Sequence, residues 1–280
     1  MQQVNPSVRV QRVETRLSGL YGDVDALIQQ WQALLNDAED QTTIGRALAR
    51  AYFARAGRDW SVLPERDLRE MAELFDYAIQ NSRASDSDVR NWFQCYRRLP
   101  EYQEYRALER FASIAATTNS LDANYYLYVL RFLRWLRGEE QSQDAALRYL
   151  EECRRLARNH RRQWSFEWLS EGREACPLAH FTELGQWRGE PEVWTRSNLL
   201  NRISGVIDKI DRPQAGLVRI ATGRMKAFFI PGTRFVRTRD LNALVEFYLG
   251  FSYEGLRAWG VDRPAAFRSE ERRVGKECRS

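Results

Sequence analysis

The sequence predicts a mainly helical protein with a small all-β domain, in which an α-α helical repeat solenoid is followed by a five-stranded β-barrel. Three observations predict this architecture. Apolar residues recur every three or four positions over most of residues 1–160, which is the period of amphipathic helices. Residues 199–263 form short alternating segments separated by glycine, a pattern typical of strands. Residues 161–198 hold tryptophans among glycines and prolines, so we expect an irregular, tryptophan-rich connector there.

The helical region is divided into hairpins by turn residues. Glycine, proline and short polar segments separate the helices at Gly57, Pro64, residues 81–88, Pro100 and Gly138. Matching the second helices of the hairpins places Phe75, Phe111 and Leu150 at equivalent positions, 36 and 39 residues apart. A period of this length belongs to helical solenoids.

The residues around these positions resemble tetratricopeptide-type repeats. Small side chains lie near each equivalent position and would let adjacent helices approach closely: Ala72, Ala107 and Ala146. No single unit holds the complete set of Trp, Gly, Tyr and Pro that characterises the family. The resemblance implies a concave surface on which a protein or peptide docks.

Aromatic residues gather in two further segments. We expect Tyr125, Tyr126, Tyr128, Phe132 and Trp135 to lie in the core and between repeats. In the connector, the indoles predict a packed joint that fixes the barrel against the last helical hairpin, and an aromatic ligand surface is the alternative. The tryptophans concerned are Trp164, Trp168, Trp187 and Trp194.

The β region contains five short segments with alternating apolar residues. They span residues 202–210, 216–220, 225–231, 244–251 and 255–261. Five short strands predict a small closed barrel of the oligonucleotide- and oligosaccharide-binding (OB) type, because closure leaves no unpaired strand edge. The alternation directs four apolar side chains into the barrel core: Phe229, Phe247, Ala258 and Val261.

The order of motifs in this region resembles cold-shock domains. The segments GLVRI (216–220), KAFFIP (226–231) and VEFYLGFSYEGLRAWGV (245–261) follow one another as the corresponding strands do in that family. The resemblance implies a platform of aromatic side chains on which unpaired bases stack. Leu217 and Arg219 replace two of the family's aromatic residues, and Phe228 retains one.

These observations define a candidate nucleic-acid-binding surface on a basic domain. Residues 199–263 carry eleven basic and six acidic side chains. Phe228 would stack on a base, and Arg219 would add a guanidinium plane. Further cations would follow the phosphates: Lys209, Arg224, Lys226, Arg234, Arg237 and Arg239. The alternative for each cation is an ordinary solvated surface residue.

Composition and residue pattern exclude several classes of protein. No apolar segment approaches the roughly 20 residues that cross a bilayer, the first residues lack a secretory signal core, and the cysteines are scattered singly, so we expect a cytoplasmic location. Neither His160 nor His180 lies beside a serine or cysteine nucleophile. Cys176 and His180 offer two metal ligands where zinc takes about four. We therefore expect no enzyme activity, metal or cofactor.

The last thirteen residues, RSEERRVGKECRS (268–280), resemble the in-frame translation of a widely used sequencing adapter. They contain one of only three lysines in a chain with forty arginines. We therefore interpret this segment as a non-native tail and leave it out of the fold prediction.

Together these features predict a non-catalytic, bacterial-type adaptor or sensor arm. Its helical repeats would dock a protein, and its basic barrel would bind RNA or single-stranded DNA. A pure protein-interaction scaffold is the second hypothesis, supported by the residues at positions 217 and 219. A regulatory fragment of a larger multidomain enzyme is the third.

Overall fold

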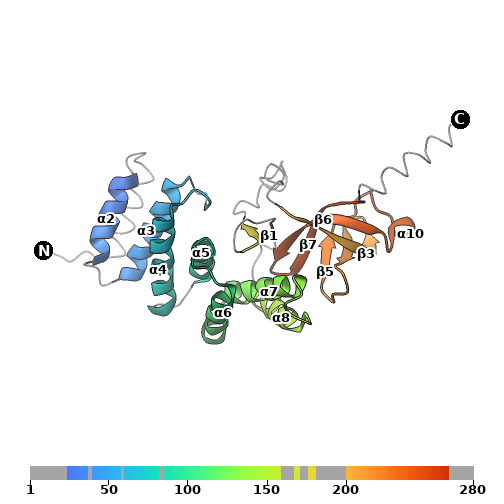
Figure 1. Ribbon diagram of the computed structural model, residues 1–280, viewed down its shortest axis with the longest axis horizontal. Coiled ribbons are helices and arrows are strands. Elements are labelled where there is room, and N and C mark those ends of the chain that lie inside the picture. Colours follow the sequence, from blue (N-terminus) through green and yellow to red (C-terminus); the bar gives the residue numbers. More distant parts are fainter. Residues whose placement is uncertain are drawn as a thin grey trace. The chain divides into compact units, whose positions relative to one another are not determined.

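The fold is a series of helices followed by a closed barrel, as the sequence predicts (Figure 1). We describe it from a computed structural model, in two compact units that divide between Ala123 and Asn124. The structure describes residues 24–36, 40–57, 60–81, 85–158, 167–170, 176–180 and 200–264. The predicted tail at 268–280 and three of the connector tryptophans (164, 187 and 194) lie outside these residues.

The first unit is helical. Its helices are α2 (Val24–Asn36), α3 (Gln41–Arg55), α4 (Glu65–Asn81), α5 (Asp86–Tyr96) and α6 (Glu104–Thr118), and α7 (Leu121–Leu136) begins at its end. Their limits follow local chemistry. The Asp40 carboxylate accepts from the Thr43 amide at the start of α3, and Ser85 forms a capping box with Asp88 at the start of α5. Asn119 adopts a left-handed φ of 52° directly after α6.

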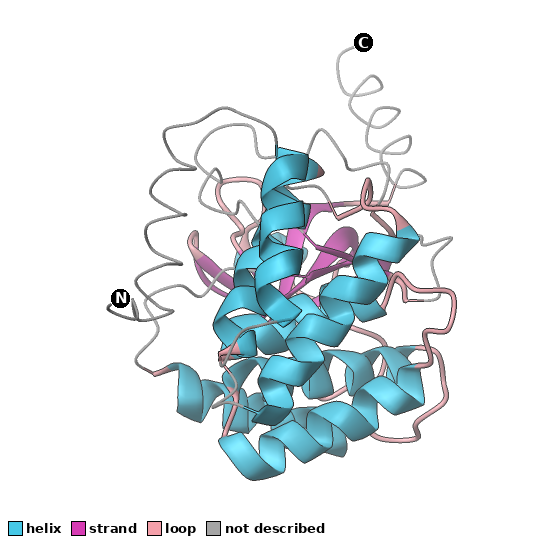
Figure 2. Cartoon of the chain, turned by 90° about the vertical axis from the view of Figure 1, so that its left-hand side faces the viewer, coloured by secondary structure: helices cyan, strands magenta, loops and turns pink. Residues whose placement is uncertain are grey.

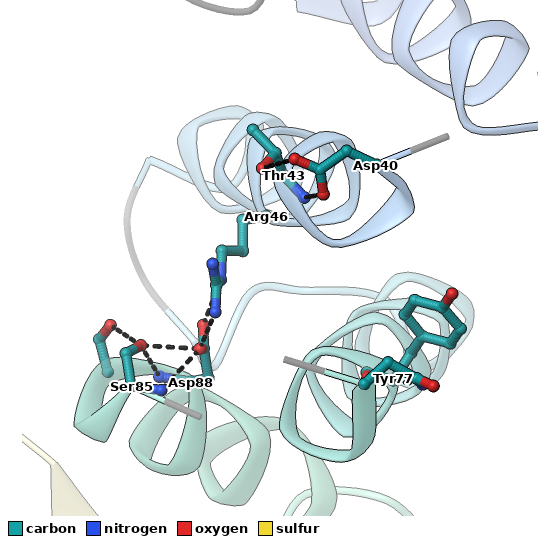
Figure 3. Close-up of polar contacts among 8 residues, drawn as sticks. Asp40, Thr43, Arg46, Tyr77, Ser85 and Asp88 are labelled. Atoms are coloured by element: carbon teal, nitrogen blue, oxygen red, sulfur yellow. Dashed lines mark hydrogen bonds and ion pairs between the residues drawn. The ribbon is translucent and has the colours of Figure 1, made fainter. Parts of the chain in front are cut away.

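Arginine–aspartate pairs join the first helices of successive hairpins. Arg46 on α3 donates through Nε to Asp88 of α5 at 2.9 Å (Figure 3). Arg90, two residues further along α5, pairs with Asp122 at the start of α7 at 2.7 Å. Both carboxylates are almost fully buried, so each pair is shielded from water. The same type of contact therefore recurs between successive hairpins.

The predicted equivalent positions all lie in the core. Phe75, Phe111 and Leu150 are buried, as are the alanines near them. Phe111 packs edge-on against Trp92 and Phe93 of α5, with ring centroids 5.5 and 5.2 Å apart. The prediction of core positions at a helical-repeat period is therefore confirmed.

The second unit contains α8 (Asp144–Ala157) and all the described strands, drawn in magenta in Figure 2. They are β1 (Glu167–Leu169), β2 (Leu178–His180), β3 (Arg202–Arg212), β4 (Ala215–Arg219), β5 (Lys226–Phe229), β6 (Leu244–Ser252) and β7 (Gly255–Asp262), with the short helix α10 (Arg237–Asp240) between β5 and β6. Within the connector region, β1 pairs with β2 and with β6, so part of this predicted irregular segment extends the barrel sheet.

Strands β3 to β7 close into a barrel. They pair in the order β3-β4-β5-β7-β6, and β6 returns to β3; β5 and β7 are parallel and the other pairs antiparallel. This order is compatible with an OB-type barrel. Close strand approach requires glycine: a Cβ on Gly216 would lie 2.4 Å from the Phe229 ring. The four residues predicted to face inward are all buried, which confirms the alternation.

The third hairpin, α7 and α8, covers one end of this barrel. Tyr125 and Tyr128 donate to the carbonyls of Phe251 and Ser252 at 3.0 and 3.1 Å. Burial raises the pKa of both phenols well above 10. The prediction that this aromatic stripe is buried is correct for Tyr125, Tyr126, Tyr128 and Phe132, whereas Trp135 is partly exposed.

The prediction of packing in the core and between repeats did not include the barrel as a partner of this stripe. The rings lie against barrel residues such as Phe251 and Tyr253, and not only against other repeats. A helical period shows which face is apolar, but it does not show which element covers that face.

Candidate nucleic-acid interface

A row of three side chains crosses the outer face of β4, β5 and β7. Leu217 pairs with Phe228, and Phe228 pairs with Arg257. The neighbours of Phe228 along β5, Ala227 and Phe229, are buried in the barrel, so Phe228 itself faces outward and is partly exposed. We call these three residues the platform row.

The centre of the platform row is a cation–π pair. The Arg257 guanidinium lies over the Phe228 ring, 4.8 Å from its centroid. It is held there by an ion pair with Glu254 at 2.8 Å, and only 18% of its side chain is exposed. Burial lowers the pKa of Arg257, but an arginine remains charged at neutral pH. The platform row therefore presents a fixed planar cation stacked on an aromatic ring.

Two cations lie beside the platform row. Arg219 on β4 pairs across the sheet with Lys226 on β5. Asp208 of β3 forms an ion pair with each of them: Lys226 Nζ lies 2.6 Å and Arg219 Nε 3.7 Å from its carboxylate oxygens. The two cationic side chains are 39% and 43% exposed. Two positive charges against one negative charge leave this cluster net positive.

The other predicted cations lie elsewhere on the second unit. Arg234, Arg237 and Arg239 share the connection between β5 and β6, where Arg234 lies 3.3 Å from Asp262 and Arg239 lies 3.2 Å from Asp240. Lys209 pairs with Asp211 on β3, and Arg224 pairs with Asp144 at the start of α8. The eight predicted residues thus fall into a platform group (Arg219, Lys226, Phe228), a β5–β6 group (Arg234, Arg237, Arg239) and two separate residues.

Sequence reasoning missed Arg257 and Asp208. Alternation along β7 marks Arg257 as outward-facing, but its position over Phe228 depends on the parallel pairing of β5 with β7. Asp208 lies in a register irregularity between Ile207 and Lys209, which pair with Val218 and Leu217. Simple alternation does not locate a side chain at such a bulge.

A second polar cluster, also missed, is buried beside α7. The Glu167 carboxylate is fully buried and lies 2.7 Å from His180 Nδ1, and it accepts from the Tyr126 hydroxyl at 3.1 Å. These contacts tie β1 and β2 to α7. They also occupy His180, one of the two residues considered as metal ligands. Among the described residues, no group of three or more His, Cys, Asp or Glu side chains is placed to hold a metal ion.

No helix in the described ranges combines the length and the apolar composition needed to cross a bilayer. Comparison of the chain with protein-family models, with curated proteins and with solved structures gave no match.

Proposed function

We propose that the barrel binds single-stranded nucleic acid, RNA or DNA, on the outer face of β4, β5 and β7. The observation that carries this proposal is the Phe228–Arg257 pair beside the cations Arg219 and Lys226. The barrel would act within a non-catalytic adaptor whose helical repeats dock a protein.

The chemistry of the face suits unpaired bases and phosphates. A base stacked on an aromatic side chain contributes about 1–3 kcal/mol, and a guanidinium plane adds a cation–π contribution. The pairs formed by Asp208 with Lys226 and Arg219 are partly exposed, and exposed pairs of this kind contribute only about 0–1 kcal/mol. Phosphate oxygens can therefore replace Asp208 at little cost, and their counterions are released.

The two family resemblances support the adaptor interpretation. The closed strand order supports a cold-shock-like barrel, in which Arg257 compensates for the aromatic residues absent at positions 217 and 219. The recurring Arg–Asp contacts and buried equivalent positions support tetratricopeptide-type repeats. Such repeats commonly dock proteins on their concave side.

The helices that cover one end of the barrel limit how far a bound nucleic-acid strand can extend along it. In OB-type barrels the loop between the last two strands flanks the ligand. Here that loop contains Tyr253, which is buried against Tyr125, and Glu254, whose carbonyl accepts from Arg154 of α8. The barrel is therefore expected to contact only the few nucleotides of a bound strand that fit beside the platform row.

The test is a titration of the full chain with fluorescent oligo-uridine and oligo-deoxythymidine over a salt series. Phe228→Ala should weaken binding about tenfold, the equivalent of one lost stacking contact. Lys226→Gln should lower the slope of log affinity against log salt by about 0.7, because one phosphate contact on a single strand is lost. Tyr105→Ala, at an exposed aromatic residue of α6, is the matched control and should change neither quantity.

A pure protein-interaction scaffold is the second candidate, and one observation favours it. Six of the seven predicted cations are paired with aspartate, which reduces the positive potential of the barrel. No binding of either oligonucleotide at low salt would leave the scaffold as the better proposal, whereas equal binding by Phe228→Ala would show that nucleic acid binds away from the platform row.

A further inference from the structure

The connection between β5 and β6 exposes an unusual number of aliphatic side chains. Ile230 is 61% exposed, Val236 47%, Leu241 42% and Leu244 44%. Only three other large hydrophobic residues in the described ranges are comparably exposed, and they lie in the helical unit. Exposed aliphatic groups that gather in one place indicate an interaction surface, whereas single ones need no explanation.

Two contacts fold this connection compactly. The rings of Phe229 and Phe235 lie 5.9 Å apart, so the chain returns to the end of β5 just before α10 begins. The buried Asp240 carboxylate accepts from the Val236 amide at 2.7 Å, and the Asp240 carbonyl accepts from the Ala243 amide at 3.0 Å. Val236 and Leu241 flank α10 at its two ends, and Leu244 lies three residues after Leu241.

Arginines surround these aliphatic residues. Arg234, Arg237 and Arg239 lie between Ile230 and Leu241, and Arg237 forms no ion pair with any described residue. Asp240 is enclosed, and its charge is balanced by Arg239 and Arg263, which lies 2.6 Å away. Four arginines against Asp240 and Asp262 leave a net positive charge. We call the four aliphatic residues with Arg234, Arg237 and Arg239 the α10 surface.

We propose that the α10 surface docks an acidic peptide that carries aliphatic side chains. Charge complementarity selects acidic residues in the partner, and the aliphatic residues provide apolar area to bury. Phosphates would also be attracted to these arginines, but a nucleic acid is the poorer fit, because it has no aliphatic groups to bury against the four exposed aliphatic side chains, and no aromatic ring of this surface is exposed for stacking. The α10 surface shares no residue with the platform row, although Ile230 follows Phe228 by two positions, and it would add a second binding function to the barrel.

The test uses the full chain and three labelled synthetic peptides. One alternates leucine with glutamate, the second alternates serine with glutamate, and the third alternates leucine with lysine. We expect the leucine–glutamate peptide to bind at least about tenfold more tightly than either of the others, since it alone matches both the charge and the apolar area. Leu241→Ser and Arg237→Glu should each weaken its binding about tenfold.

Matched controls separate this site from the platform row. Arg148→Glu makes the same charge change on the exposed part of α8 and should leave peptide binding unchanged. Phe228→Ala should also leave it unchanged, although that variant is expected to weaken oligonucleotide binding. Leu241 and Arg237 are exposed, so circular dichroism of both variants should match that of the parent chain.

Three results would overturn the proposal. The first is equal binding of the serine–glutamate and leucine–glutamate peptides, or no binding of either at low salt. The second is a loss of oligo-uridine binding in Arg237→Glu with peptide binding unaffected, which would assign the surface to nucleic acid. The third is self-association in sedimentation velocity that Leu241→Ser abolishes, which would show that a second copy of the chain covers the surface.

Discussion

The two ends of the barrel differ in what completes them. At one end, the β4–β5 and β6–β7 loops are covered by α7 and α8, whose side chains bond directly to loop backbone: Gln143 Oε1 accepts from the Met225 amide at 2.7 Å. At the other end, the Gly232 amide donates to the Pro213 carbonyl at 2.8 Å, and the neighbouring α10 surface remains exposed. The comparison shows that side chains from the helical hairpin bury the loops at one end and complete their backbone hydrogen bonds. The loops at the other end expose aliphatic and arginine side chains to water.

The largest expected difference between the ends comes from deleting one apolar side chain at each. Phe251 is fully buried and packs against Tyr128 and Phe132 of α7. Phe251→Ala should lower the free energy of unfolding of the second unit by about 3–5 kcal/mol, because a cavity is left. Ile230→Ala at the open end should change it by less than about 0.5 kcal/mol. Urea unfolding followed by near-ultraviolet circular dichroism measures both, and equal effects would contradict the distinction.

The open end should still depend on one buried charge. Asp240→Asn should cost about 1.5–3 kcal/mol, because the contacts with Arg239 and Arg263 lose their charge. Although burial alone would raise the pKa of Asp240, the hydrogen bonds from Arg239, Val236 and Arg263 lower it overall. The carboxylate therefore stabilises the fold fully above its unfolded-state pKa of about 3.9, and this contribution is lost as the pH falls further.

This pH dependence can be measured directly. The stability difference between the parent chain and Asp240→Asn should be constant between about pH 5 and 7 and should shrink below about pH 4. Thermal unfolding in a series of buffers records it. A difference that persists unchanged at acid pH would mean that the side chain acts through packing and not through its charge.

Replacing one glycine by alanine at each end of the barrel should change the stability of the second unit by a smaller amount. A Cβ on Gly223, at the covered end, would lie 2.4 Å from Gln143 Nε2 and 2.7 Å from the Trp135 ring. Gly223→Ala should therefore destabilise the second unit by about 1–3 kcal/mol through overpacking. Gly232, at the open end, has no atom within 4 Å of such a Cβ but a φ of +60°. Gly232→Ala should cost about 1 kcal/mol, the strain of a left-handed alanine. Differential scanning fluorimetry ranks the two.

A small effect at neutral pH should come from one hydroxyl of the covered end. Tyr128→Phe removes the hydrogen bond to the Ser252 carbonyl and should cost about 1 kcal/mol. Because burial raises the folded-state pKa of this phenol, the parent chain should lose stability as the pH rises above about 10, where the unfolded phenol ionises. Tyr128→Phe should lose less stability over the same rise in pH, because it has no phenol at this position. An identical alkaline profile for both chains would contradict the buried position of this hydroxyl.

Much of the fold was predictable because local patterns decide it. Glycine placement and alternation located all five barrel strands and their inward residues, since the period of two fixes which side chains face the core. Glycine, proline and short polar segments separated the helices of the first unit from one another. The candidate platform was predictable only in part: the resemblance to cold-shock domains and the excess of basic residues pointed to Phe228, Arg219 and Lys226, but nothing in the pattern identified the aspartate partner of the two cations.

For the helices of the repeats and the five barrel strands, the sequence alone determined the type of element and the side chains that it buries, because these properties follow from the period of the apolar residues; β1, β2 and α10 were not predicted. Only the tertiary structure decided what those faces meet. It placed the tyrosines of α7 on barrel carbonyls, Arg257 over Phe228, and Asp208 between two predicted binding cations. Such contacts join residues far apart in the chain, and their geometry depends on strand pairing and helix docking that no local period encodes.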